Sequence, residues 1–135
     1  MGGVIRAEVL PLAVDSDVVL LRHAVRVASG ELNFTIIEAT KMITAACELA
    51  RNTLVHAGGG EVHLDFIAEG ARSGLRLTFV DRGPGIADLE RALSDGYSTN
   101  GGLGLGLGGS RRLVDEFDIV SRPGEGTRVT ITRWK

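Results

Sequence analysis

The chain has 135 residues, of which 44% are hydrophobic and 24% charged, and its formal net charge is -2. These values are typical of a globular protein and exclude a disordered chain, and the length favours a single domain over residues 1–135. The weak negative charge gives no reason to expect nucleic acid or an anionic membrane as a partner. Because Cys47 is the only cysteine, no internal disulfide is expected, and we expect a protein of the reducing cytoplasm.

The first half of the chain predicts one strand and two helices. Residues Val4–Leu12 alternate loosely between apolar and polar and indicate a strand. The next stretch, 15–30, is typical of a helix that begins with Asp15 or Ser16 as its N-cap and ends at a glycine. Residues 34–57 contain no helix breaker and carry apolar residues at helical spacing, so they predict a long helix that ends at three glycines.

The rest of the chain predicts two β-hairpins with two helices between them. Glycine-containing loops separate stretches that alternate with period two. Because helices and antiparallel strands come in blocks, we expect an α+β class, with one mixed, mostly antiparallel sheet and helices on one of its faces. The expected elements are strands 61–69 and 74–81, helices 87–94 and 107–117, and strands 117–121 and 127–134.

A carboxylate is predicted at the end of one strand, on the apolar face of that strand. Leu75, Leu77 and Phe79 share a face, and Asp81 has the same parity. A carboxylate directed towards an apolar layer needs a hydrogen-bond donor. The segment that follows, 82–86, is a glycine-containing turn, and a solvated aspartate in a tight turn explains the same residues.

Glu48 and Asn52 lie four residues apart on the predicted long helix and therefore share a face. Together a carboxylate and an amide can hold a divalent cation or orient a hydroxyl group and a water molecule. An isolated pair with this spacing is more often a surface pair on an amphipathic helix. The role of His56, one turn further on, is left open.

A loop that alternates glycine with leucine precedes the predicted helix 107–117. Residues 104–109 match G-x-G-x-x-G, but they do not follow the first strand of a βαβ unit, as a dinucleotide-binding fold requires. Successive backbone amides at the start of a helix favour an anion. The alternating leucines favour a loop that partly packs over a free hinge, so we expect this loop to bind phosphate.

These motifs in series resemble those of the GHKL ATP-binding family. They are Glu-x-x-x-Asn from Glu48, Asp-x-Gly-x-Gly from Asp81, a Gly-x-Gly loop that opens a helix, and Gly-Thr in a late strand. The resemblance spans Glu48–Ile131 and implies a two-layer α/β sandwich that binds ATP and Mg²⁺.

The resemblance also implies a role for each motif. Glu48 would be the candidate general base, and Asn52 would ligate a Mg²⁺ that bridges the phosphates. Asp81 would accept a hydrogen bond from the adenine amino group. The residues that complete the adenine pocket would be Gly83, Gly85, Ile86 and Thr127, and those that wrap the phosphates would be Gly102, Leu103, Gly104, Leu105, Gly106 and Leu107.

Within this family, the segments "ELARN", "DRGPGI" and "DGYSTNGGLGLGL" resemble the RsbT-like serine/threonine kinases, the switch proteins of the bacterial stressosome in the anti-sigma-factor branch. That resemblance implies phosphorylation of STAS-domain antagonist and co-antagonist proteins (RsbS/RsbR-like) and, on release, activation of an RsbU-like phosphatase. The alternative is an anti-sigma factor that sequesters a sigma factor in a nucleotide-dependent way. The roles of Arg111 and Arg112 are left open, and Val4–Leu12 is expected to be an exposed edge strand.

Overall fold

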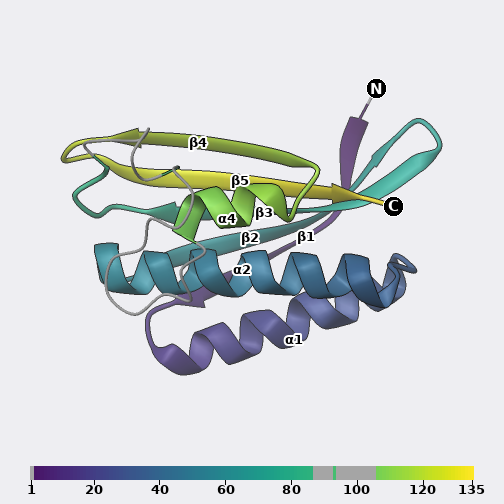
Figure 1. The fold of residues 1–135 in the computed structure, drawn as a ribbon, viewed down its shortest axis with the longest axis horizontal. Coiled ribbons are helices and arrows are strands. Elements are labelled where there is room, and N and C mark those ends of the chain that lie inside the picture. The colour runs from purple at the N-terminus through teal and green to yellow at the C-terminus, as the bar shows by residue number, and fades with distance from the viewer. Residues whose placement is uncertain (1, 87–92, 94–105) are drawn as a thin grey trace.

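The described elements form a five-stranded sheet with helices on one side (Figure 1). This computed structural model describes residues 2–86, 93 and 106–135. The elements confirm the expected α+β class. In chain order they are β1 (Gly2–Leu12), α1 (Asp15–Glu31), α2 (Ile36–Ala57), β2 (Gly60–Glu69), β3 (Arg72–Asp81), α4 (Gly106–Arg112), β4 (Glu116–Arg122) and β5 (Gly126–Trp134).

The strand order in the sheet is β1-β2-β3-β5-β4, so β1 and β4 are the two edges. All four neighbouring pairs of described strands are antiparallel, and the sheet as described therefore contains no parallel pair. The expected edge position of the N-terminal strand is confirmed. Both predicted hairpins are present, as β2–β3 and β4–β5.

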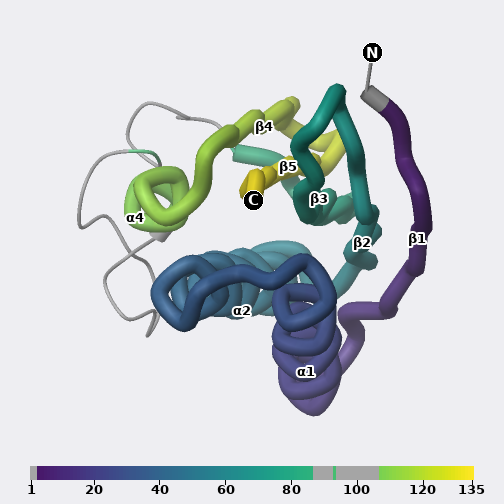
Figure 2. The backbone as a smooth tube through the Cα atoms, turned by 90° about the vertical axis from the view of Figure 1, so that its right-hand side faces the viewer, coloured from purple at the N-terminus to yellow at the C-terminus, as the bar shows by residue number. Residues whose placement is uncertain are grey.

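The core lies between the sheet and the layer formed by α1 and α2 (Figure 2). Leu75, Leu77 and Phe79 of β3 are buried on the helix-facing side, as their parity predicted. Residues 45–50 of α2 are all buried, including those that face away from the sheet. This follows from the position of α2, which contacts α1, α4 and the sheet.

The ends of α1 differ from the prediction. The N-cap is Val14, because the Asp17 carboxylate reaches back and accepts hydrogen bonds from the backbone amides of Ala13 at 2.7 Å and Val14 at 3.0 Å. These two donors hold the pKa of Asp17 below its usual value. The helix also continues past residue 30 to Glu31, and it is Asn33 that adopts the left-handed conformation, with a φ of 60°.

The C-terminal end of α2 follows the prediction, whereas the helix begins at Ile36, two residues after the predicted start. Thr35 is the N-cap: its hydroxyl accepts from the Glu38 amide at 3.1 Å, and the Glu38 carboxylate accepts from the Thr35 amide at 2.8 Å. This reciprocal capping box satisfies two amides that the helix itself leaves unpaired. At the other end Gly58 takes a left-handed φ of 74°, a conformation that glycine adopts at less cost than other residues.

The predicted helix 107–117 is wrong at its C-terminal end. Helix α4 ends at Arg112, and the chain then joins the sheet, because the Asp115 amide donates to the Thr132 carbonyl at 2.9 Å. The helix expected at 87–94 lies outside the described residues, apart from Leu93. Among the described helices, none is long and apolar enough to cross a membrane.

Candidate functional site

Asp81 lies at the end of β3, directly opposite Thr127 of β5. Its Oδ1 accepts hydrogen bonds from the backbone amides of Gly83 at 2.9 Å and Thr127 at 3.2 Å. The predicted need for a donor is thus met by two amides, one from the following turn and one from the neighbouring strand. The second carboxylate oxygen, Oδ2, accepts no hydrogen bond within the described part of the chain, which leaves an oriented acceptor on the helix-facing side of the sheet.

Three glycines bring backbone segments into contact around Asp81. A Cβ on Gly83 would lie 2.5 Å from the Cβ of Ala57, at the end of α2. A Cβ on Gly85 would lie 2.2 Å from the carbonyl oxygen of Arg122, and one on Gly126 would lie 2.2 Å from that of Asp81. These distances are far inside van der Waals contact, so the site requires glycine at all three positions. Gly126 was foreseen only as part of the Gly-Thr motif.

A pair of hydroxyl groups lies next to Asp81. The Oγ1 of Thr127 is 2.7 Å from the Oγ of Ser121, and the same Ser121 oxygen accepts from the Ile86 amide at 2.7 Å. The Gly124 amide donates to the Pro84 carbonyl at 2.8 Å. These bonds fix the turn after Asp81 against the β4–β5 hairpin. Sequence reasoning missed Ser121, because only the β4–β5 register places it opposite Thr127.

Glu48 and Asn52 lie on α2, as predicted, but they are not a surface pair. Glu48 is only 2% exposed, whereas Asn52 is half-buried. The Glu48 Oε1 lies 3.3 Å from the Nη1 of Arg51, whose side chain is 48% exposed. A buried carboxylate is unfavourable without a counter-charge, and Arg51 provides one. Glu48 is therefore not part of a solvated helix face.

The C-terminal part of α2 connects these two groups of residues. Ala57, which contacts Gly83, follows Asn52 by five residues, or about 7.5 Å along the helix axis. A Cβ on Gly60 would lie 3.1 Å from the Cγ2 of Thr53, so α2 also lies close to the start of β2. Asp81, Asn52 and Glu48 are thus placed in series along one side of the sheet.

Part of the glycine loop is outside the described residues, namely Gly102, Leu103, Gly104 and Leu105. The described part shows that α4 begins at Gly106, that Leu107 is buried in the core, and that α4 contacts α2. The end of the loop is therefore anchored beside the helix that carries Glu48 and Asn52. His56, Arg111 and Arg112 are exposed, and their roles stay open.

Comparisons with known proteins show the family to which the chain is similar. The family model described as Histidine kinase-, DNA gyrase B-, and HSP90-like ATPase matches residues 37–135. The chain is 41% identical over 118 residues to the serine/threonine-protein kinase RsbT of Bacillus subtilis, covering 87% of this chain and 89% of that protein. It is 29% identical to an anti-sigma F factor of Thermoanaerobacter sp., covering 84% of this chain and 82% of that protein.

A similar solved structure supports the fold. The crystal structure of the RsbU and RsbW domains of Rv1364c from Mycobacterium tuberculosis superimposes with a TM-score of 0.64 at 19% sequence identity. The match covers 95% of this chain and 32% of the other, so this chain corresponds to about a third of that protein.

Proposed function

The chain belongs to the histidine kinase-, DNA gyrase B-, and HSP90-like ATPase family, and on that premise we propose that it is a protein kinase that transfers the terminal phosphoryl group of ATP to a serine or threonine. The observation that carries this proposal is the similarity to a serine/threonine kinase over nearly the full length of both chains. Two features of the structure support it: the buried Glu48 beside Arg51, and the Oδ2 of Asp81, which accepts no hydrogen bond from the residues that the structure describes.

In this proposal, Asp81 recognises the adenine ring. Its Oδ1 is held by the amides of Gly83 and Thr127, so the direction of Oδ2 is fixed before any ligand arrives. A free carboxylate oxygen is a strong acceptor for the exocyclic amino group of adenine. Gly83, Gly85, Ile86 and Thr127 surround that position, and the glycine loop from Gly102 to Leu107 is proposed to lie over the phosphates.

The side chains on α2 fit a magnesium-bound triphosphate. Among the described residues, no three His, Cys, Asp or Glu side chains gather in a metal-binding cluster. Mg²⁺ characteristically takes only one or two protein ligands and completes its shell with phosphates and water, which suits the single amide oxygen of Asn52. When bound, Mg²⁺ supplies charge neutralisation on the phosphates.

Glu48 is proposed to position the hydroxyl group that is phosphorylated. The bond between the γ-phosphorus and the bridging oxygen breaks, ADP leaves, a new phosphorus–oxygen bond forms to the serine or threonine, and the hydroxyl proton passes to the Glu48 carboxylate. Because the transition state is loose, little proton abstraction is needed early, so orientation by Glu48 matters most. Arg51 balances the charge of the buried carboxylate.

The substrate class is proposed from the relatives. We infer that the chain phosphorylates STAS-domain proteins of the RsbS and RsbR type and, once released from them, activates an RsbU-like phosphatase in the cytoplasm. The similarity to RsbT supports this assignment. The similarity to anti-sigma F factors supports the alternative, a regulator that sequesters a sigma factor.

The test is transfer of labelled phosphate from ATP, with magnesium, to a purified RsbS-like STAS protein. We expect Glu48→Gln to lower the rate by about 10²-fold, the lower end of the range for loss of a positioned acid–base group, while ATP binding is retained. Glu8→Gln is the matched control, because Glu8 is an exposed carboxylate on the edge strand β1. Clear ATP binding without any transfer by the wild type would overturn the kinase proposal. Retention of a sigma factor by that same protein would then support the alternative.

A further inference from the structure

Three polar side chains form a row across the sheet at the proposed adenine site. Ser121 of β4 lies opposite Thr127 of β5, and Thr127 lies opposite Asp81 of β3. All three are half-buried. The next row on the same side of the sheet is apolar and lies in or against the core: Ile119, Val129 and Phe79. The polar row therefore marks the place where the core ends and hydrogen-bonding groups begin.

The Ser121 hydroxyl group connects the strand to the turn that follows Asp81. Its oxygen accepts a hydrogen bond from the Ile86 amide at 2.7 Å and lies 2.7 Å from the Oγ1 of Thr127. The carbonyl oxygen of Gly126 is further away, at 3.3 Å. A serine hydroxyl has a single proton, and O–H···O bonds are usually about 2.5–3.0 Å long. The Ser121 proton is therefore better placed on Thr127 than on Gly126.

This hydrogen bond determines what Thr127 can offer to a ligand. When the Thr127 oxygen accepts from Ser121, the Thr127 hydroxyl keeps its own proton for a further acceptor. Asp81 Oδ2, in the neighbouring position of the row, is itself an acceptor. The row thus presents an acceptor and a donor side by side.

The order of these two groups matches one edge of adenine. The amino group of adenine donates, and the adjacent ring nitrogen, N1, accepts. A 6-oxopurine has the reverse order, a carbonyl oxygen next to an N1–H, so both of its groups would meet a group of the same kind. The row therefore favours adenine over a 6-oxopurine through two contacts, of which Asp81 supplies only one.

We propose that Ser121 is a positioning residue for recognition of the nucleotide base. Its hydroxyl donates to Thr127 and thereby directs the Thr127 proton to N1 of adenine. The inference rests on the proposed function, because it concerns the same ATP site. It adds a residue that does not contact the nucleotide and acts through Thr127.

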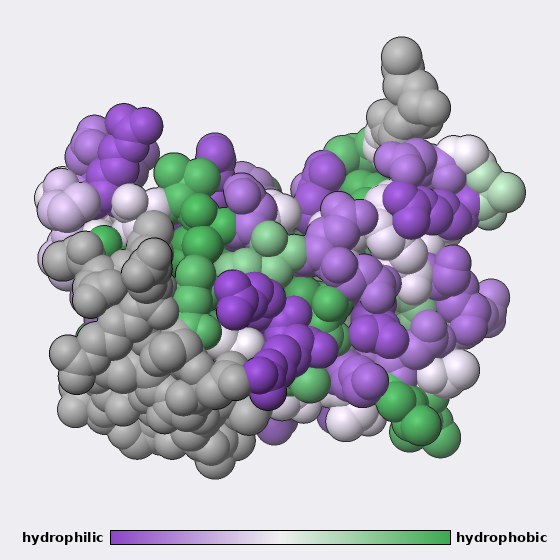
Figure 3. All heavy atoms as spheres, turned by 45° about the horizontal axis from the view of Figure 1, so that its top comes forward, coloured by the Kyte–Doolittle hydropathy of each residue, from purple (hydrophilic) through white to green (hydrophobic). Residues whose placement is uncertain are grey.

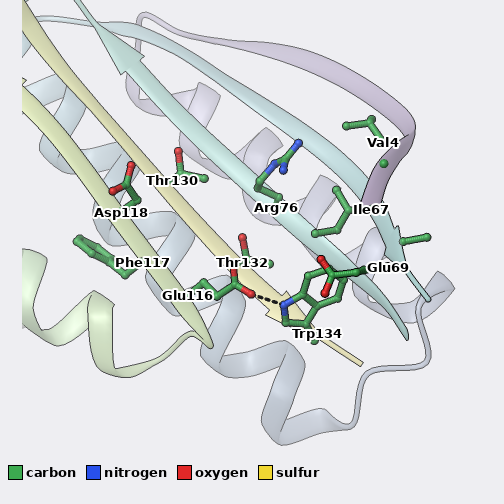
Figure 4. Close-up of a pocket in the computed structure, with 12 residues that line it drawn as sticks. Val4, Ile67, Glu69, Arg76, Glu116, Phe117, Asp118, Thr130, Thr132 and Trp134 are labelled. Atoms are coloured by element: carbon green, nitrogen blue, oxygen red, sulfur yellow. Dashed lines mark hydrogen bonds between the residues drawn. The ribbon is translucent and has the colours of Figure 1, made fainter. Parts of the chain in front are cut away.

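The opposite face of β5 supplies a matched control. Thr130 has the opposite parity to Thr127 and lines a groove on the face of the sheet that the described helices leave uncovered (Figure 4). Polar and apolar side chains are interleaved on that side of the molecule (Figure 3). The sheet itself separates Thr130 from Asp81, so Thr130→Val removes the same hydroxyl group from the same strand without touching the polar row.

The test compares the affinities for ATP and for 1-deaza-ATP, in which a C–H group replaces N1, by calorimetric titration in the presence of Mg²⁺. We expect the wild type to bind ATP about fivefold more tightly, the effect of one neutral hydrogen bond. This preference should disappear in Ser121→Ala and in Thr127→Val. It should persist in Thr130→Val and in Ser121→Thr, which keeps the hydroxyl group.

The ratio of the two affinities separates positioning from a structural role. If Ser121 only holds the turn through the Ile86 amide, Ser121→Ala weakens both nucleotides by the same factor and leaves the preference unchanged, which would overturn the inference. Should Ser121→Ala fail to fold, Ser121→Cys takes its place with the same expectation, because a thiol is a weak donor.

Failure of the inference and failure of the proposed function give different results. Tight and equal binding of ATP and 1-deaza-ATP by the wild type would overturn the inference and leave the proposed function intact. An equal loss of preference in Thr130→Val would also overturn the inference. The absence of ATP binding by the wild type would contradict the proposed function, and the inference with it.

Discussion

The two ends of the β3–β5 ladder are built from similar parts but differ in what they leave available. At one end Asp81 pairs with Thr127, and at the other Gly74 pairs with Trp134. Glycine allows close approach at both ends. Beside Trp134 the aromatic ring fills the space over the glycine, and Arg72 lies over that ring at 3.8 Å. Beside Asp81 backbone atoms fill the space, and one carboxylate oxygen accepts no hydrogen bond from the described residues. Glycine alone therefore does not indicate a binding site, and the proposal for the Asp81 end depends on the oriented acceptor beside the glycines.

The largest predicted effect is a loss of folding stability when a glycine near Asp81 is replaced. Gly126→Ala combines a φ of +94° with a Cβ placed 2.2 Å from the Asp81 carbonyl oxygen, so we expect a loss of about 3 kcal/mol or more in the free energy of unfolding. Gly124→Ala, in the same hairpin, has a φ of +80° and nothing within 4 Å, so strain alone predicts a loss of about 1 kcal/mol. Urea unfolding of both variants measures the difference. Equal losses would contradict the packing described around Asp81.

A smaller effect, on the affinity for ATP, is expected when the Asp81 carboxylate is replaced. In Asp81→Asn the side-chain oxygen can still accept hydrogen bonds from the amides of Gly83 and Thr127. The side-chain NH₂ group then faces the adenine amino group, so two donors oppose each other. We expect affinity for ATP to fall at least about tenfold, which corresponds to roughly 1.4 kcal/mol, with the fold retained. Calorimetric titration measures this, with the exposed Asp15→Asn as the control. Unchanged affinity in Asp81→Asn would remove Asp81 from the site.

The smallest predicted effect is the loss of stability when Arg72, beside Trp134, is replaced. Arg72→Ala removes the cation over the Trp134 ring and an exposed ion pair with Glu69, so the stability loss should be about 1 kcal/mol or less. Affinity for ATP should be unchanged, because this end of the ladder is proposed to have no contact with nucleotide. Arg72→Lys keeps the charge and should lose less. A marked fall in ATP affinity with Arg72→Ala would break the contrast between the two ends.

Local patterns in the sequence predicted much of the Asp81 end. The parity of Leu77, Phe79 and Asp81, and that of Thr127 with Val129, is a property of each strand alone, and the structure places these residues as expected. The 3.6-residue period and the closing glycines likewise predicted the position of α2. The roles assigned to these residues in binding ATP stay predictions.

Contacts between distant segments could not be predicted. The pairing of Ser121 with Thr127, the burial of Glu48 by neighbouring elements, and the packing of Trp134 on Gly74 all depend on strand order and register. The end of α4 was misplaced for the same reason, because a bond from the Asp115 amide to the Thr132 carbonyl draws that segment into the sheet. The N-cap of α1 was predicted at the wrong residue, because the capping carboxylate belongs to Asp17, which lies inside the first turn of the helix.

The most direct test of the account is an NMR titration of ¹⁵N-labelled protein with Mg²⁺ and ATP. The amides of Gly83 and Thr127 both donate to Asp81 Oδ1, so they report directly on a ligand that engages the other oxygen of that carboxylate. The account predicts saturable shifts of these two amides, with the indole N–H of Trp134 unmoved. Saturable binding that shifts the Trp134 indole and leaves Gly83 and Thr127 unchanged, or no binding at all, would contradict it.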